Sequence, residues 1–114
     1  MHEGAVTRNI MDLVLRTLEQ KGIDAPVTAV NVLVGVSQGL VPDSMRMFFD
    51  MEKPGTPLAG AELNVQLQPL TARCPACDKE IEIDAPVMIC RRCGGPMDLI
   101  RGAELVVSSI EVEQ

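Results

Sequence analysis

Hydrophobic residues recur at helical spacing at the start of the chain. Between Val6 and Gln20 they fall every three or four positions, with charged residues on the other faces. The apolar positions are Val6, Ile10, Leu13, Val14 and Leu18. This spacing predicts an amphipathic helix. Lys21-Gly22, a cation followed by a glycine, is typical of a helix end.

Three later segments alternate between apolar and polar residues, which is typical of strands. They run from Val27 to Val36, from Glu62 to Gln68 and from Leu105 to Val112. In the first segment we expect Val30, Val32, Val34 and Val36 to share a face, and in the last Val106, Ser108, Ile110 and Val112. The last strand is expected to pair with the two earlier ones.

A second helix is predicted between the first two strands. Pro42 suits the first helical position and Asp43 favours the first turn. Met45, Phe48 and Phe49 form the apolar face, and Pro54-Gly55 ends the helix. The resulting order predicts an α+β fold, in which two helices back a three-stranded sheet.

All four cysteines lie between the second and third of these strands. They form two C-x-x-C pairs separated by twelve residues, Cys74/Cys77 and Cys90/Cys93. Two such pairs favour a tetrahedral zinc site, and four thiolates would leave no position open for a substrate. Iron bound by the same sulfurs, disulfides and reactive thiols are the alternatives.

The cysteine segment offers little to bury. Its apolar residues are Ile81, Ile83, Val87, Met88 and Ile89, and Glu80–Asp84 alternates like a short hairpin strand. Such a segment needs an ion to hold it together. We therefore expect residues 70–101 to form an inserted, zinc-ribbon-like domain, and residues 1–69 plus 102–114 to form the α+β domain.

Composition and charge narrow the function. The 114 residues are 46% hydrophobic but include only two aromatic residues, so Val, Leu and the seven Met residues are expected to fill the core. A net charge of −6 argues against nucleic-acid binding. The sequence has no secretory leader and no apolar stretch of about 18 residues, so we expect a cytoplasmic protein that keeps its cysteines reduced and does not enter a membrane.

Catalytic motifs are missing. The single histidine is His2, and no lysine follows Gly35–Gly39 as a phosphate-binding loop would require. We therefore predict that the protein is not an enzyme.

The amino terminus carries a second candidate metal site. The α-amine of Met1 and the backbone nitrogen and imidazole of His2 can chelate one ion, with Glu3 adding a fourth donor through its backbone nitrogen or carboxylate. Nitrogen-rich, square-planar coordination selects Ni(II) or Cu(II). A terminal histidine can also be an incidental surface residue, and the chain alone leaves that alternative open.

These features together resemble the hydrogenase nickel-incorporation proteins, the HypA/HybF family. The resemblance rests on Met1-His2-Glu3, Pro42, the run from Gly55 to Leu63, Pro69 and the two cysteine pairs. It implies nickel at His2 with Met1 and Glu3, and zinc at the four cysteines.

The family resemblance also implies a role and partners. Nickel would pass to the large subunit of [NiFe] hydrogenase together with a GTPase, HypB. A monomer or weak homodimer is expected. The rival hypothesis is a zinc-ribbon interaction module with no part in metal delivery.

Overall fold

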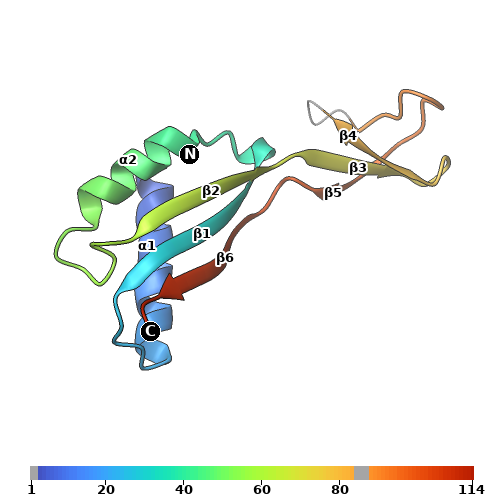
Figure 1. Ribbon diagram of the computed structural model, residues 1–114. Coiled ribbons are helices and arrows are strands. Elements are labelled where there is room, and N and C mark those ends of the chain that lie inside the picture. Colours follow the sequence, from blue (N-terminus) through green and yellow to red (C-terminus); the bar gives the residue numbers. More distant parts are fainter. Residues whose placement is uncertain (1–2, 84–87) are drawn as a thin grey trace.

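The computed structural model describes residues 3–83 and 88–114, with two helices, a short 3-10 helix and two small sheets (Figure 1). The elements are α1 (Glu3–Gln20), β1 (Val27–Gly35), η1 (Val36–Gln38), α2 (Pro42–Glu52), β2 (Glu62–Gln68), β3 (Leu70–Cys74), β4 (Lys79–Ile83), β5 (Asp98–Arg101) and β6 (Leu105–Val112). The predicted α+β class is confirmed. The molecule is elongated, with extents of 55 × 26 × 17 Å.

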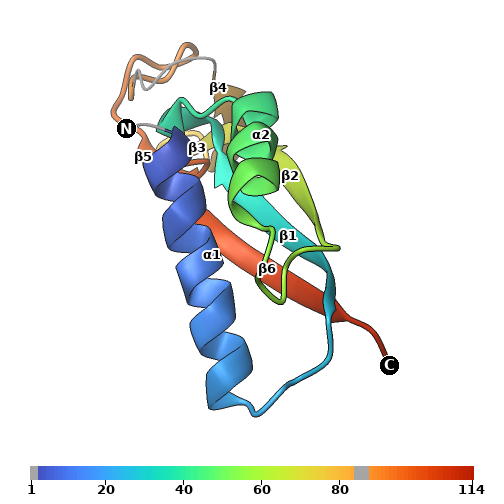
Figure 2. The same cartoon turned by 90° about the vertical axis from the view of Figure 1, so that its left-hand side faces the viewer.

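The first sheet has the strand order β2-β1-β6. β1 is parallel to β2 and antiparallel to β6, so the last strand pairs with only one of its two predicted partners. Both helices cover the same face of this sheet (Figure 2). β1 ends at Gly35, one residue before the predicted end, and Val36 is exposed at the start of η1.

The core lies between the two helices and the first sheet. Val14 of α1, Val30 and Val34 of β1, and Met45 and Phe49 of α2 are fully buried there. The expectation that the methionines fill the core is wrong for two of them. Met47 and Met51 are 53% and 67% exposed, because both lie on the outer side of α2, away from the face that carries Met45 and Phe49.

The predicted inward face of β6 is wrong for the first half of the strand, because the strand contains a β-bulge. Asn31 pairs with Ser109 and Val32 with Val107, so Ser108 is the extra residue, and its hydroxyl donates to the Asn31 carbonyl at 3.1 Å. A bulge reverses the alternation of the residues that precede it relative to those that follow. Val106 is therefore 46% exposed. The core-facing residues are Leu105, Val107, Ile110 and Val112.

The second sheet has the order β4-β3-β5 and contains the predicted hairpin strand as β4. β5 was not predicted.

The chain passes between the sheets at residues 68–70 and 101–105, beside Gly35. A Cβ on Gly35 would lie 2.2 Å from the Gly102 carbonyl oxygen, and one on Gly102 would lie 2.6 Å from the Leu70 Cα. Only glycine allows these backbones to approach so closely.

η1 forms hydrogen bonds to the segment that leads from β5 to β6, at the junction between the two sheets. The Ser37 hydroxyl donates to the Gly102 carbonyl at 2.7 Å, and the Gln38 amide donates to the Ala103 carbonyl at 2.6 Å. The Gly35 N–H donates to the Glu104 carbonyl at 2.7 Å.

Among the residues that the structure describes, no helix combines the length and hydrophobicity that crossing a lipid bilayer requires.

Candidate metal centre

Two tight turns place the four cysteines. β3 ends at Cys74, and the chain turns through Cys77 and Asp78 into β4, where the Asp78 N–H donates to the Cys74 carbonyl at 2.8 Å. The second turn is closed in the same way, because the Gly94 N–H donates to the Cys90 carbonyl at 2.8 Å. Each C-x-x-C pair therefore curls around a common point.

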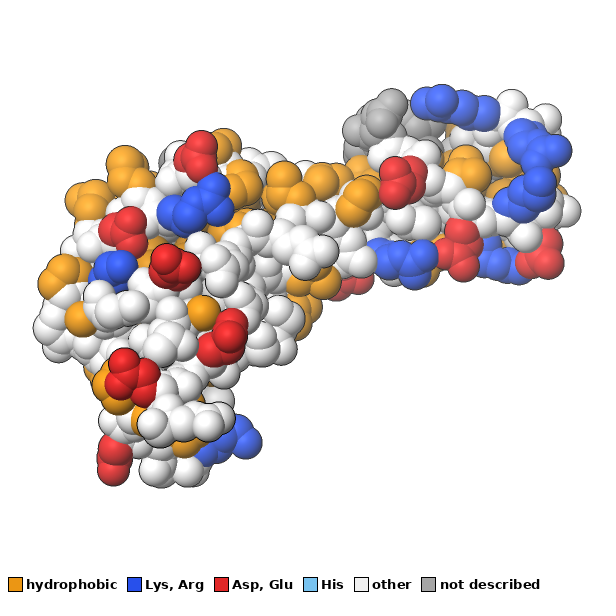
Figure 3. Space-filling view, in the orientation of Figure 1, with side chains coloured by type: hydrophobic (Ala, Val, Ile, Leu, Met, Phe, Trp, Pro, Cys, Tyr) orange, Lys and Arg blue, Asp and Glu red, His pale blue; other side chains and the backbone are white. Residues whose placement is uncertain are grey.

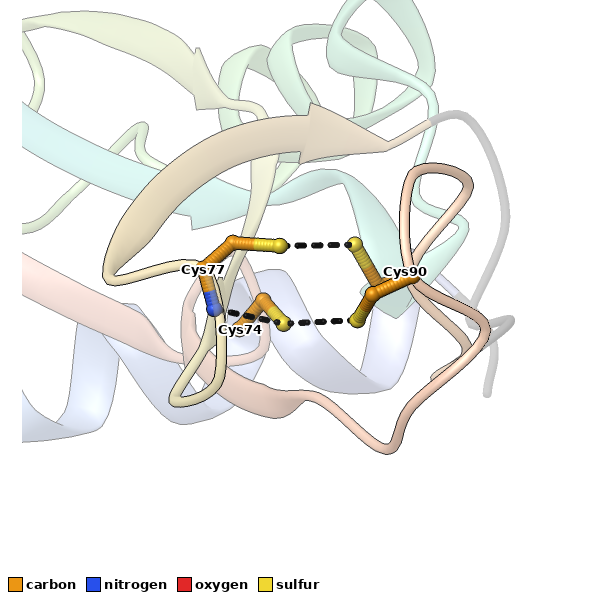
Figure 4. Close-up of side chains that lie close together, drawn as sticks. Cys74, Cys77 and Cys90 are labelled. Carbon is orange, nitrogen blue, oxygen red and sulfur yellow. Dashed lines mark hydrogen bonds between the residues drawn. The ribbon is translucent and has the colours of Figure 1, made fainter.

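The four sulfur atoms converge on that point, and all lie within 4.8 Å of one another. The sulfurs of Cys74 and Cys93 are 3.5 Å apart, and those of Cys77 and Cys90 are 4.0 Å apart (Figure 4). A tetrahedron of metal–sulfur bonds of about 2.3 Å has edges of about 3.8 Å, so the spacing fits one tetrahedral ion. A disulfide would need about 2.05 Å between sulfurs. All four cysteines are free, which excludes the disulfide alternative in this structure.

Backbone N–H groups around the cluster favour thiolates. The Cys77 N–H donates to the Cys74 sulfur and the Gly95 N–H to the Cys93 sulfur, each at 3.4 Å. Hydrogen bonds from the backbones of Cys93 and Arg92 lower the pKa of the Cys90 thiol to about 6. By contrast, side-chain hydrogen bonds with Cys93 and Cys74 raise the pKa of the Cys77 thiol to about 12. A metal ion would replace the protons that the four sulfurs share.

The surroundings of the cluster bury little apolar surface. Its buried members are Ala72, Cys74, Cys90 and Met97, with Cys77, Ile81, Ile83 and Met88 packed partly against them. The expectation that Ile89 adds to this core is wrong: it is 59% exposed, and it lies outside the strands, where its backbone makes only an isolated bridge to Pro96. Val87, also expected here, lies outside the described residues.

The surface around the second sheet and the cysteine cluster carries both basic and acidic side chains. Lys and Arg side chains gather along the outer edge of the part that contains β3, β4 and β5, with Asp and Glu between them (Figure 3). Arg73 pairs with Asp78, and Arg101 pairs with Glu80 at 2.6 Å. These two pairs neutralise part of the basic charge on this surface, which weakens its attraction for phosphates.

The predicted nickel ligands lie only partly within the structure. Met1 and His2 are outside the described residues, whereas Glu3 is the first residue of α1. Its carboxylate Oε2 accepts a hydrogen bond from the Val41 N–H at 3.0 Å, just before α2. A Cβ on Gly4 would stand 3.2 Å from the Phe48 ring, so α1 begins in close contact with α2.

This anchoring of Glu3 was not foreseen from the sequence. Pro42 predicted where α2 begins, but no local pattern shows that residue 41 lies beside residue 3. Among the described residues, the four cysteines are the one group of three or more metal-binding side chains close enough to share an ion.

Comparison with known proteins agrees with this architecture. Residues 1–112 match the family model described as "Hydrogenase/urease nickel incorporation, metallochaperone, hypA". The chain is 40% identical over 113 residues to hydrogenase maturation factor HypA of Desulfatibacillum aliphaticivorans, covering 98% of this chain and 87% of that one. It is also 40% identical over 115 residues to the factor of the same name from Nostoc punctiforme, covering 100% and 97%.

Solved structures agree on the fold. The solution structure of the Ni metallochaperone HypA from Helicobacter pylori has a TM-score of 0.67 at 18% identity, covering 98% of this chain and 97% of that one. A second solution structure of a HypA protein gives a TM-score of 0.71 at 17% identity, covering 99% and 97%. The family match spans nearly the whole chain and includes both predicted metal-binding segments. The chain therefore belongs to the HypA family, the nickel metallochaperones of hydrogenase maturation.

Proposed function

We propose that this protein binds Ni(II) at its amino terminus, through His2 with Met1 and Glu3, and releases it during maturation of [NiFe] hydrogenase. The observation that carries the proposal is the family match, which begins at residue 1 and so includes all three residues. The Met1 amine, the His2 backbone nitrogen and the His2 imidazole would supply three nitrogen donors, a set suited to Ni(II).

We assign the fourth donor to Ni(II) to the backbone nitrogen of Glu3. Its carboxylate is already engaged by the Val41 N–H at 3.0 Å, which supports a positioning role for that side chain. The contact fixes the first turn of α1 against the start of α2. The residues immediately before Glu3 would then bind the ion next to an ordered support rather than on a loose tail.

We assign zinc to Cys74, Cys77, Cys90 and Cys93, as a structural ion that is not transported. The sulfur spacing and the small apolar cluster around it support this assignment. Residues 70–101 would form the inserted zinc domain, and residues 1–69 plus 102–114 the nickel domain. A thiolate site of this kind also favours a reducing compartment such as the cytoplasm.

Release of nickel would follow competition for the ion. The bound amine and imidazole must be deprotonated, so protons and nickel compete for the same nitrogen atoms. The partners we propose are the GTPase HypB and the hydrogenase large subunit, which would offer nickel better-placed ligands. Nickel affinity should fall as the pH drops below about 6.5, near the ordinary imidazole pKa.

The direct test adds one residue before Met1 and measures nickel binding by calorimetry. The extension moves the α-amine away from His2, so we expect nickel binding to be lost or strongly weakened while zinc content and circular dichroism stay unchanged. A matched control adds one residue after Gln114. His2→Ala should give the same loss. Unchanged nickel binding in the amino-terminal extension, or equal affinity at about pH 5.5 and pH 7.5, would contradict the proposal.

A further inference from the structure

The charges of this chain are divided unequally between its two parts. The part around the cysteine cluster, residues 70–101, contains five basic and five acidic residues. The net charge of −6 therefore belongs to the side chains of the rest of the protein. In an otherwise acidic molecule, the cysteine-bearing part is the region where basic side chains are not outnumbered by acidic ones.

Three basic residues lie close to the cysteines. Arg91 and Arg92 form the turn within the second C-x-x-C pair, and Lys79 follows the first pair by two residues. Because the four sulfur atoms lie within 4.8 Å of one another, the two turns are neighbours in space. All three side chains are exposed, and basic side chains gather along this outer edge of the molecule (Figure 3).

These three cations form no ion pair with a carboxylate in residues 3–83 and 88–114. The ion pairs of the second sheet join Arg73 to Asp78 and Arg101 to Glu80. Four thiolates around a divalent ion would add a charge of about −2, but the sulfurs of two of these cysteines are on buried residues. The exposed cations are thus available to an anion from outside, and an arginine can hold a carboxylate through two N–H groups.

An exposed apolar side chain accompanies the cations. Ile89 precedes Arg91 by two residues and is 59% exposed, and its backbone is held by the bridge to Pro96. Protein–protein interfaces commonly combine an apolar contact with polar residues around it, and arginine is enriched in them. This surface therefore offers both kinds of contact.

We propose that Lys79, Ile89, Arg91 and Arg92 form a docking surface for an acidic segment of a partner protein. Carboxylates of the segment would pair with the three cations, and an apolar side chain of the segment would lie against Ile89. Charge complementarity also selects the place of contact, because the acidic remainder of the chain repels such a segment.

Other anionic partners fit this surface less well. Tight binding to DNA uses about 6–10 phosphate contacts, and anionic membranes attract clusters of about 4–8 basic residues. Three cations on a chain of net charge −6 fall short of both. A protein segment needs fewer charges because it also gains the apolar contact at Ile89.

Zinc would shape this docking surface without taking part in the contact. Both turns that carry the cations are closed by cysteines, so an ion at the four sulfurs would fix their positions relative to each other. The residues assigned to nickel are at the start of α1 and are not part of the surface. A partner could therefore be held here while the amino terminus stays accessible, and the inference does not rest on the nickel proposal.

Amide NMR of the untagged, zinc-loaded chain tests the surface, with a short peptide in which glutamate alternates with leucine as the probe. We expect chemical-shift changes at residues 77–79 and 89–95, and weaker binding as salt is added. The same peptide with glutamine in place of glutamate should leave these shifts unchanged. Equal shifts with the two peptides, shifts confined to the first sheet and its helices, or no shifts at low salt would overturn the proposal.

Charge-neutralised variants test the assigned residues. Replacing both arginines, Arg91→Gln with Arg92→Gln, should weaken peptide binding at least about fivefold. The matched control, Arg16→Gln with Lys21→Gln, removes two exposed cations near the end of α1 and should bind normally. Lys79→Gln lies outside both C-x-x-C pairs, so it should weaken binding at full zinc content even if the double variant loses its ion.

Two results with these reagents would contradict the assignment. One is a Lys79→Gln variant and a zinc-loaded double variant that both bind the acidic peptide like the parent. The other is tighter binding of a short single-stranded oligonucleotide, or of vesicles containing phosphatidylserine, than of the acidic peptide at the same salt concentration.

Discussion

The two sheets of this molecule have the same number of strands but are held together in different ways. Among residues 3–83 and 88–114, the first sheet and its helices enclose a core of fifteen buried residues, whereas the second sheet is built around four, of which two are cysteines. All four residues of β5 are exposed. Burial of apolar surface can stabilise the first unit, but the second has too little to bury.

This difference fits the separate roles proposed above for the two regions. A unit folded by burial keeps its shape whether or not metal is present, so it can offer a terminus that binds and loses an ion. A unit folded by four thiolates depends on its ion, so that ion is poorly suited to be the one that is delivered. Three predictions follow from this difference, and we give them from the largest expected effect to the smallest.

Removal of zinc should have the largest effect. Structural zinc in small zinc-finger peptides contributes about 10–16 kcal/mol of apparent binding free energy at neutral pH, and folding there depends on it. We expect chelation, or Cys90→Ser, to unfold β3, β4 and β5 while α1 and α2 persist. Amide NMR spectra and far-ultraviolet circular dichroism report the two units separately. Ser109→Ala, an exposed hydroxyl lost from the first sheet, is the control that should leave both intact.

Loss of helical signal together with zinc would contradict this separation, because it would make the first unit depend on the metal as well.

Truncation in the first core should have the next largest effect. Phe49 is fully buried between α2 and the sheet, and Phe49→Ala should lower the free energy of unfolding by about 3–5 kcal/mol. Phe48→Ala, at a half-buried neighbour, should cost less. Urea denaturation measures both. Zinc affinity should stay the same, and a large drop in it would show that the two units fold as one.

The junction between the units should give the smallest effect. Gly102 has a φ of 103°, and an added Cβ would stand 2.6 Å from the Leu70 Cα. Gly102→Ala should therefore destabilise by about 1–3 kcal/mol and change the relative orientation of the units. Gly55→Ala is a matched control, because Gly55 also has a positive φ, 79°, but its Cβ would meet open space. Small-angle scattering should differ between the two variants, and identical curves and stabilities would argue against a tight junction.

Much of the fold was predictable because its signals are local. α2 begins at Pro42 as its proline predicts, and β2 and β6 have the predicted bounds. The inward face of β6 was not predictable, since the bulge at Ser108 depends on its pairing with β1. β5 was missed because Asp98–Arg101 is short and does not alternate; its pairing with β3 alone makes it a strand.

At the candidate sites too, local spacing was predictable from the sequence, whereas contacts between distant residues were not. The C-x-x-C spacing indicated a four-sulfur cluster, and the structure brings all four sulfurs together. The contact between the Glu3 carboxylate and the Val41 N–H joins residues far apart in the sequence, so no motif could reveal it. Nickel at Met1 and His2 stays a prediction that only metal-loaded protein can test.

The most direct test of two metals at two separate sites is X-ray absorption at the zinc and nickel edges of one untagged, doubly loaded sample. Zinc should be surrounded by four sulfur atoms at about 2.3 Å. Nickel should show only nitrogen and oxygen neighbours, in a planar arrangement. Sulfur bound to nickel, or zinc displaced as nickel is added, would mean that the cysteine cluster carries the transported ion.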